Sequence, residues 1–363
     1  MTRYVFKLVL FLGLLFVGFA FANAMTATET GQYGYSGTGM EVVAMKDDLA
    51  AAMADNVVPD PIPAASKDGE LSAYAYENVK VLGHLTTGEF TRLMVGITAW
   101  VAPEEGCNYC HNPENMASDE VYTKVVSRRM LQMTMQINSK WGAHVAPSGV
   151  TCFTCHRGQP VPKYIWFDEP ASAPSKSLVG DLAGQNVAAG AVGVTSLPFD
   201  PFNPFLEGES RIRVVSDTPL PTGNRASIKQ AEWTYGLMMH MSDSLGVNCS
   251  HCHNTRAMAE WSQSPAPRAK AWYGIRMARE LNNDYLVPLA DVYPEHRLGR
   301  LGDPPKANCK TCHRGVYKPL LGAPMLKDYP SLAAARPAPP PKPEPEPEPT
   351  EETDGSTEPP ATE

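Results

Sequence analysis

Eight cysteines and four of the nine histidines in this 363-residue chain fall into one repeated arrangement. Each pair of cysteines has the spacing C-x-x-C, and a histidine directly follows the second cysteine. Two thiols at this spacing can reach the two vinyl groups of one porphyrin edge, and the adjacent histidine can then ligate the iron. The pattern therefore predicts four covalently bound c-type haems. Their attachment residues would be Cys107, Cys110, Cys152, Cys155, Cys249, Cys252, Cys309 and Cys312, and their proximal ligands His111, His156, His253 and His313.

A C-x-x-C pair alone is also typical of a zinc knuckle or a redox-active dithiol. A zinc site does not need a histidine directly after the second cysteine, and it draws its four ligands from two adjacent knuckles. Since a histidine follows all four pairs and no cysteine lies outside them, the sequence favours haem attachment. Covalent haem attachment takes place outside the bacterial cytoplasmic membrane, so we expect an export signal.

The first residues fit such a signal. Arg3 and Lys7 form a short basic region, an apolar run extends from Leu8 to Ala22, and Ala22-Asn23-Ala24 offers a cleavage site. The run is short for a membrane span, which needs about 17–25 residues, although the aromatic residues before it would lengthen it. Residues 1–24 are therefore predicted to be a signal peptide or a retained N-terminal membrane anchor.

Helical periodicity precedes each haem motif, and four helices are expected, over about 86–102, 118–140, 227–245 and 268–281. The first starts at a capping box of Thr86 with Glu89, and the third at Ser227–Gln230 with Gly246 after its end. The fourth should end at Asn282-Asn283. The second helix should present one apolar stripe, made of Val121, Val125, Met133 and Ile137. These elements predict a mainly α protein with long irregular loops.

The four motifs differ from one another in a regular way. The first and third continue as Cys-His-Asn, whereas the second and fourth read Thr-Cys-His-Arg-Gly. Such self-similarity over a long period is typical of an internal duplication. We therefore predict a multihaem cytochrome c built of two pseudo-repeated dihaem halves, at residues 86–160 and 227–325.

The remaining segments lack sustained periodicity, and the chain's 34 prolines and 28 glycines are more than a helical protein of this size needs. Residues 25–85 are predicted to be an extended N-terminal arm with short turns, and residues 161–226 a connector. Segment 326–363 is proline-rich, and from Arg336 onward it holds eight acids against two bases. It cannot bury an apolar core and is predicted to be a disordered acidic tail.

A second axial ligand for each iron has to come from elsewhere in the chain. Electron carriers use Met or His there, and Met raises the reduction potential, but a methionine is more often a core residue. Met94 has no rival on its helix, 13 residues before Cys107. His144, in the loop before the second motif, is as plausible a distal ligand as a surface histidine. Elsewhere the residues leave open the choices Met130, Met133 or Met135, and Met238, Met239 or Met241.

Stretches outside the motifs resemble a known family. The pattern over about residues 32–325 is similar to the reaction-centre-bound tetrahaem cytochrome subunit of purple photosynthetic bacteria. The similar stretches are Val79–Gly83, Gly88–Met94, His144–Ala146, Ile212–Ser216, Leu220–Asn224, Lys229–Met239 and Asp243–Cys249. Matches in the connector carry the most weight, since haem attachment does not dictate those residues. The chain departs from many members in having no N-terminal lipid-anchored cysteine, and its acidic tail lies outside the family pattern.

The resemblance implies one ligand pair for each iron. The pairs are Met94 with His111, Met130 with His156, Met238 with His253, and His144 with His313. In the last pair the two histidines come from different halves of the protein, whereas the internal repeat would suggest Met277 in place of His144. A bis-histidine haem should have a lower potential than the Met/His haems, which gives an uneven ladder of potentials.

The resemblance also implies an electron carrier rather than an enzyme. It would pass single electrons from a soluble carrier, such as cytochrome c2 or a high-potential iron-sulfur protein, to the photo-oxidised bacteriochlorophyll special pair. It would contact the reaction centre L and M subunits at the periplasmic face of the (intra)cytoplasmic membrane, with no role for nucleic acid. The haem on Cys249 and Cys252 would lie nearest the pigments, and that on Cys107 and Cys110 farthest away. A free periplasmic electron shuttle is the alternative, and a multihaem oxidoreductase is less favoured because it needs an open iron position.

Overall fold

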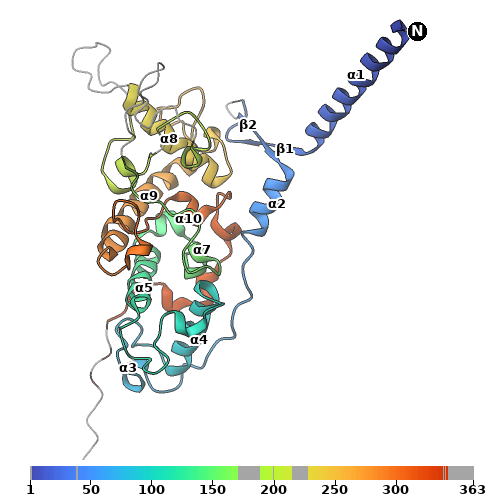
Figure 1. The fold of residues 1–363 in the computed structure, drawn as a ribbon. Coiled ribbons are helices and arrows are strands. Elements are labelled where there is room, and N and C mark those ends of the chain that lie inside the picture. The colour runs from blue at the N-terminus through green and yellow to red at the C-terminus, as the bar shows by residue number, and fades with distance from the viewer. Residues whose placement is uncertain are drawn as a thin grey trace, which may run out of the picture.

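The computed structural model describes residues 2–37, 40–170, 189–198, 200–214, 228–337, 339 and 341. The molecule is elongated, with α8 (Ile228–Leu245) at one end and α3 (Ser72–Ala75) and α4 (Thr87–Val101) at the other (Figure 1). Between these ends lie α5 (Tyr122–Lys140), α6 (Gly142–Val145), α7 (Cys152–His156), α9 (Pro267–Glu280) and α10 (Cys309–His313). Helices predominate among the described residues, which confirms the prediction of a mainly α protein.

Short helical turns complete the body. The 3₁₀ turns span Gly106–Tyr109, Gly190–Val192, Cys249–His251, Val287–Leu289, Glu295–Arg297, Pro319–Gly322 and Pro330–Leu332. Two π turns, at Asn203–Glu207 and Leu281–Leu286, and the short helix α11 (Met325–Asp328) make up the rest.

The N-terminal region contains more regular structure than the predicted extended arm. A single helix, α1 (Thr2–Thr26), projects from the body (Figure 1). Its stretch Arg3–Asn23 is fully exposed, and its mean hydropathy of 2.5 and its length suit a membrane span, a test that a signal sequence also passes. A β hairpin follows, β1 (Thr28–Tyr33) paired antiparallel with β2 (Met40–Met45), and α2 (Lys46–Ala54) continues from it.

The capping box that begins α4 is formed as predicted. Thr86 Oγ1 accepts a hydrogen bond from the Glu89 N–H at 3.3 Å, and Glu89 Oε2 accepts one from the Thr86 N–H at 3.2 Å. Both bonds satisfy amide donors that a helix start would leave unpaired. This end of α4 is therefore encoded locally, and the helix runs from it toward the first haem motif.

The start and the buried face of α5 differ from the prediction. The helix begins at Tyr122 rather than near Ser118, because Ser118 Oγ accepts from the Glu120 N–H and forms a turn instead. Of the predicted apolar stripe, Ile137 is buried and Val121, Val125 and Met133 are partly buried. The other fully buried apolar side chains of α5 are Leu131 and Met135. These two pack in a core that includes residues distant in sequence, and helical periodicity alone does not reveal that contact.

The helices α8 and α9 lie close to their predicted bounds of 227–245 and 268–281. α8 ends before Gly246, which adopts φ +64° as expected of a residue after a helix end, while its predicted cap at Ser227 lies outside the described residues. The sequence predicts that helical geometry ends at Asn282-Asn283. Instead, the chain continues from α9 into the π turn Leu281–Leu286. Asn282 is fully buried and donates to the carbonyls of Leu206 (2.8 Å) and Ala307 (3.0 Å). It is therefore a bonded core residue and not a helix stop.

Two apolar cores support the motifs, and each includes a segment that was predicted to be irregular. The first core consists of Leu82, Leu85, Leu93, Trp100, Leu131, Met135, Tyr329 and Leu332. Because Tyr329 and Leu332 are buried, the predicted start of the disordered tail at residue 326 is too early. The acidic part of the tail, residues 342–363, lies outside the described residues. The second core consists of Trp166, Phe202, Phe205, Leu206, Leu237, Met241, Ile275 and Ala278, so the connector supplies half of it.

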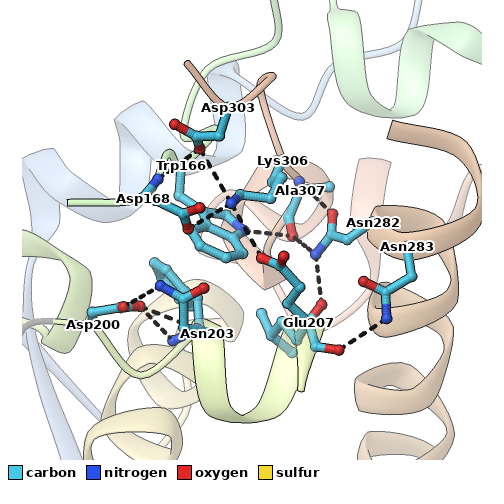
Figure 2. Close-up of polar contacts among 12 residues, drawn as sticks. Trp166, Asp168, Asp200, Asn203, Glu207, Asn282, Asn283, Asp303, Lys306 and Ala307 are labelled. Atoms are coloured by element: carbon cyan, nitrogen blue, oxygen red, sulfur yellow. Dashed lines mark hydrogen bonds and ion pairs between the residues drawn. The ribbon is translucent and has the colours of Figure 1, made fainter. Parts of the chain in front are cut away.

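A buried lysine ties the connector to the segment before the fourth motif (Figure 2). Lys306 is 1% exposed, and its Nζ lies 2.6 Å from Asp168, 3.1 Å from Glu207 and 3.1 Å from Asp303. It also lies 4.1 Å from the ring centroid of Trp166, and the Trp166 and Lys306 backbones exchange two 3.0 Å hydrogen bonds. One ammonium group thus holds three carboxylates together three residues before Cys309.

Replacing Lys306 by Met keeps the side-chain volume but leaves three carboxylates facing one another. Removing one partner of a buried ion pair costs about 3–5 kcal/mol. We expect Lys306→Met to lower the free energy of unfolding, measured by chemical denaturation of the haem-loaded protein, by this amount. The exposed Lys163→Met is the matched control and should change stability little. A loss below about 1 kcal/mol for Lys306→Met, the size of a surface pair, would contradict the assigned role of the cation.

Candidate haem sites

The second and fourth motifs share one local geometry. Each forms a five-residue helix, α7 or α10. In both, the residue that caps the helix and the third helical residue are hydrogen-bonded to each other. These pairs are Thr151 with Thr154 and Asn308 with Thr311. The arginine after each histidine adopts a left-handed backbone conformation, with φ +51° at Arg157 and +47° at Arg314. These conformations turn the chain toward α4 in the second motif and toward α8 in the fourth.

The glycines that end these two motifs repeat the same contact. The N–H of Gly158 donates to the Trp100 carbonyl near the end of α4, and the N–H of Gly315 donates to the Ser244 carbonyl near the end of α8, both at 2.8 Å. The second motif therefore lies against the helix that leads to the first motif, and the fourth against the helix that leads to the third.

The first and third motifs share a different geometry. Both are 3₁₀ turns, and in both the asparagine after the histidine accepts a bond from the N–H two residues on, Asn112 from Glu114 at 2.9 Å and Asn254 from Arg256 at 3.0 Å. The two kinds of motif seen in the sequence are thus two kinds of backbone, and they alternate along the chain.

Each motif histidine is oriented by a backbone carbonyl. Nδ1 lies 3.0 Å from the Met116 oxygen in His111 and 2.9 Å from the Met258 oxygen in His253, five residues on in both cases. In the other two motifs the partner is three residues on, with distances of 2.9 Å for His156 and 3.1 Å for His313. A carbonyl only accepts, so Nδ1 carries the proton and Nε2 keeps the lone pair that a metal needs.

Burial favours the neutral form of three of the four motif histidines. It is the main cause that lowers the pKa of His313 to about 4, with the nearby His144 as the second cause, and it also lowers the pKa of His156 and His253. None of the eight cysteines, all within the described residues, forms a disulfide. Burial raises the pKa of Cys152 to about 12, as expected of a thiol in apolar surroundings.

The second and fourth motifs meet each other directly. The sulfurs of Cys155 and Cys312 are 2.8 Å apart. Arg157 Nη2 donates to the Cys312 carbonyl at 2.8 Å, and Arg314 Nη2 donates to the Cys155 carbonyl at 2.7 Å. Each motif therefore uses its own arginine to hold the second cysteine of the other, and this reciprocal pair of bonds joins the two motifs.

His144 reaches the fourth motif across this junction. It lies on α6, and its ring centroid is 6.0 Å from that of His313. Two imidazole rings at this separation could hold one metal ion between them. The carbonyl of Lys270 on α9 orients His144 Nδ1 at 2.9 Å, and Gly274 leaves room for the ring, since an added Cβ would come within 2.6 Å of it.

The other candidate ligands are carried by the helices as predicted. Met94 on α4 and Met238 on α8 are partly buried against the first and second core, and Met130 lies partly buried on α5. His240, by contrast, is a bonded core histidine, with Nδ1 2.9 Å from the Ala191 carbonyl and Nε2 3.3 Å from Ser244. It needs no metal to satisfy its ring nitrogens.

Sequence reasoning missed the residues that orient these motifs. Asn248 and Ser250 in the third motif bind the hairpin, through a 2.6 Å bond to the Met40 carbonyl and a 3.1 Å bond from the Met40 N–H. Arg157 and Arg314, which join the second and fourth motifs, belong to the repeated Cys-His-Arg-Gly sequence, and this repeat could have indicated a shared structural role. The hairpin contact had no sequence signal, because it joins segments about 200 residues apart.

Thiols without disulfides, uniformly oriented histidines and the ring of His144 beside that of His313 fit c-type haem, which supplies one-electron redox chemistry when bound. The fold and sites thus define a c-type cytochrome. Residues 24–333 match the family model described as "Photosynthetic reaction centre cytochrome C subunit". The chain belongs to this family, which confirms the resemblance seen in the sequence.

Curated relatives agree with the family match. The chain is 55% identical over 305 residues to the photosynthetic reaction center cytochrome c subunit of Rubrivivax gelatinosus, covering 84% of this chain and 83% of that protein. It is 52% identical over 303 residues to the subunit of Thermochromatium tepidum, covering 84% and 74%. The subunit of Roseobacter denitrificans is 42% identical over 328 residues, covering 84% and 86%.

The close contact between Gly246, at the end of α8, and Gly315, at the end of the fourth motif, allows the packing of this site to be tested. Gly246 has φ +64°, and a Cβ there would lie 2.1 Å from the Gly315 carbonyl oxygen. Gly302 has φ +83° with nothing within 4 Å, so it isolates the backbone cost of about 1–2 kcal/mol. We expect Gly302→Ala to lose about this much stability in chemical denaturation and Gly246→Ala to lose clearly more, with lower haem content by pyridine haemochrome assay. Equal losses would show that this contact tolerates a methyl group.

Proposed function

We propose that the chain binds four c-type haems in two pseudo-repeated dihaem halves. The alternation of the two motif geometries, and the matching Gly158 and Gly315 contacts, support the duplication. The proposed ligand pairs are Met94 with His111, Met130 with His156, Met238 with His253, and His144 with His313. His144 is preferred over Met277 for the fourth iron because its ring lies beside that of His313.

Contacts between motifs support a row of haems in the order first, second, fourth, third. The second motif touches the end of α4, which leads to the first motif, and the fourth touches the end of α8, which leads to the third. The second and fourth touch each other through Cys155 and Cys312. The elongated shape, with α4 and α8 at opposite ends, agrees with such a row (Figure 1).

In this proposal the row carries electrons to the photo-oxidised special pair of a reaction centre. The single observation that carries it is this continuous series of contacts, from α4 through the second and fourth motifs to α8, in a member of the reaction-centre cytochrome family. A soluble periplasmic donor, cytochrome c2 or a high-potential iron-sulfur protein, would deliver electrons at the first motif. The third motif would face the L and M subunits at the periplasmic surface of the membrane, the end at which the hairpin after α1 is bound.

Flash excitation of membranes tests this function. Re-reduction of the special pair should be accompanied by haem oxidation, and deleting the gene for the chain should slow it. The chain should also co-purify with bacteriochlorophyll after detergent solubilisation. A chain recovered free of pigment, together with unchanged re-reduction in the deletion strain, would instead indicate the free periplasmic shuttle.

The cross-half ligand can be tested by His144→Met. Four haems should remain attached because every thioether cysteine is intact, but one midpoint potential should rise, since Met raises haem potential relative to His. The exposed His296→Met serves as the control and should leave all four potentials unchanged. Redox titration of both variants checks this, and four unchanged potentials in His144→Met would exclude His144 as a ligand.

A further inference from the structure

The end of α2 inserts one carboxylate between the second and fourth motifs. Both carboxylate oxygens of Asp55 lie 3.3 Å from Arg314 Nη1, and its Oδ2 lies 3.8 Å from Arg157 Nη1. Arg157 Nη1 also donates to the Asp55 backbone carbonyl. One residue of the N-terminal region therefore contacts the arginines of both halves.

The next residue fixes this contact in place. Asn56 is 1% exposed, and its Nδ2 donates to the Arg314 carbonyl at 3.3 Å while its Oδ1 accepts from the Leu320 N–H at 3.0 Å. A second bond from Nδ2 to the Ala52 carbonyl, at 2.7 Å, ties the side chain back to α2. The carboxylate of Asp55 is thus held at the junction by its neighbour and by α2.

The charges at this junction do not balance. The side chains of Arg157 and Arg314 are 3% and 2% exposed, while that of Asp55 is 33% exposed. Among the described residues, Asp55 is the carboxylate that forms ion pairs with both arginines. Among the described residues the two buried cations therefore share one anion, and losing it would leave both arginines, next to Cys155 and Cys312, without that ion-pair partner.

A buried charge acts strongly on its neighbours because the protein interior screens it little. Oxidised haem iron carries one more positive charge than reduced iron. Nearby cations therefore favour the reduced state and raise the midpoint potential, whereas a nearby carboxylate lowers it. Both arginines bond to the carbonyl of a haem-attaching cysteine, so they lie close to both central sites.

We propose that Asp55 is a positioning residue for electron transfer, the shared counter-charge that lowers the midpoint potentials of the two central haems, those on Cys152/Cys155 and Cys309/Cys312. This inference rests on the proposed four-haem function and goes beyond it, since it assigns the tuning of two haems to one residue of the N-terminal region. The two outer haems, on the first and third motifs, are expected to respond little.

Redox titration of the purified, haem-loaded full chain tests this with Asp55→Asn. This change keeps the shape and an acceptor oxygen but removes the charge. We expect two of the four midpoint potentials to shift upward and two to stay in place. Asp55→Glu should restore values near the parent, and Asp48→Asn, an exposed acid on the same helix, should change none.

Arg157→Gln gives the opposite sign and separates charge from structure. Removing a cation should shift the same two potentials downward, and the double variant Asp55→Asn with Arg157→Gln should return toward the parent. If both single variants shift the potentials in the same direction, or if neither shifts them, the counter-charge role is wrong. If Asp55→Asn fails to load haem, Arg157→Gln alone decides the question. A downward shift of the two central potentials supports the counter-charge role, and the absence of a shift refutes it. A parent protein with fewer than four titrating haems would instead refute the proposed function.

Discussion

The reciprocal bonds between Arg157 and Cys312 and between Arg314 and Cys155 are the constraint on which the rest of the molecule depends. A buried guanidinium group is stable only when it is paired and hydrogen-bonded. Each arginine satisfies part of this need on the other motif, so separating the two motifs would remove a hydrogen bond from each buried guanidinium group. The junction therefore fixes the second and fourth motifs side by side.

Other features of the centre follow from that junction. Next to the junction, α6 packs against α9, and Lys270 and Gly274 on α9 orient and accommodate His144. His144 then lies beside His313, although 169 positions in the chain separate them. The connector completes the assembly through Lys306, which holds three carboxylates just before the fourth motif (Figure 2).

The sequence predicted what local chemistry determines. The capping box of Thr86 and the end of α8 at Gly246 depend on neighbours within a few residues, and both are found as expected. The buried face of α5, the continuation of the chain past Asn282, and the hairpin bound to Ser250 depend on partners far away in sequence. Periodicity carries no signal for such contacts, and a buried Asn or Lys reads from sequence as a surface or turn residue.

A structure of the haem-loaded subunit bound to its reaction centre tests the central claim most directly. The account predicts that the irons follow one another in the order first, second, fourth, third, with His144 and His313 on the same iron and the third motif nearest the pigments. A row that follows the order of the motifs along the chain, or a fourth iron bound by Met277, would contradict it.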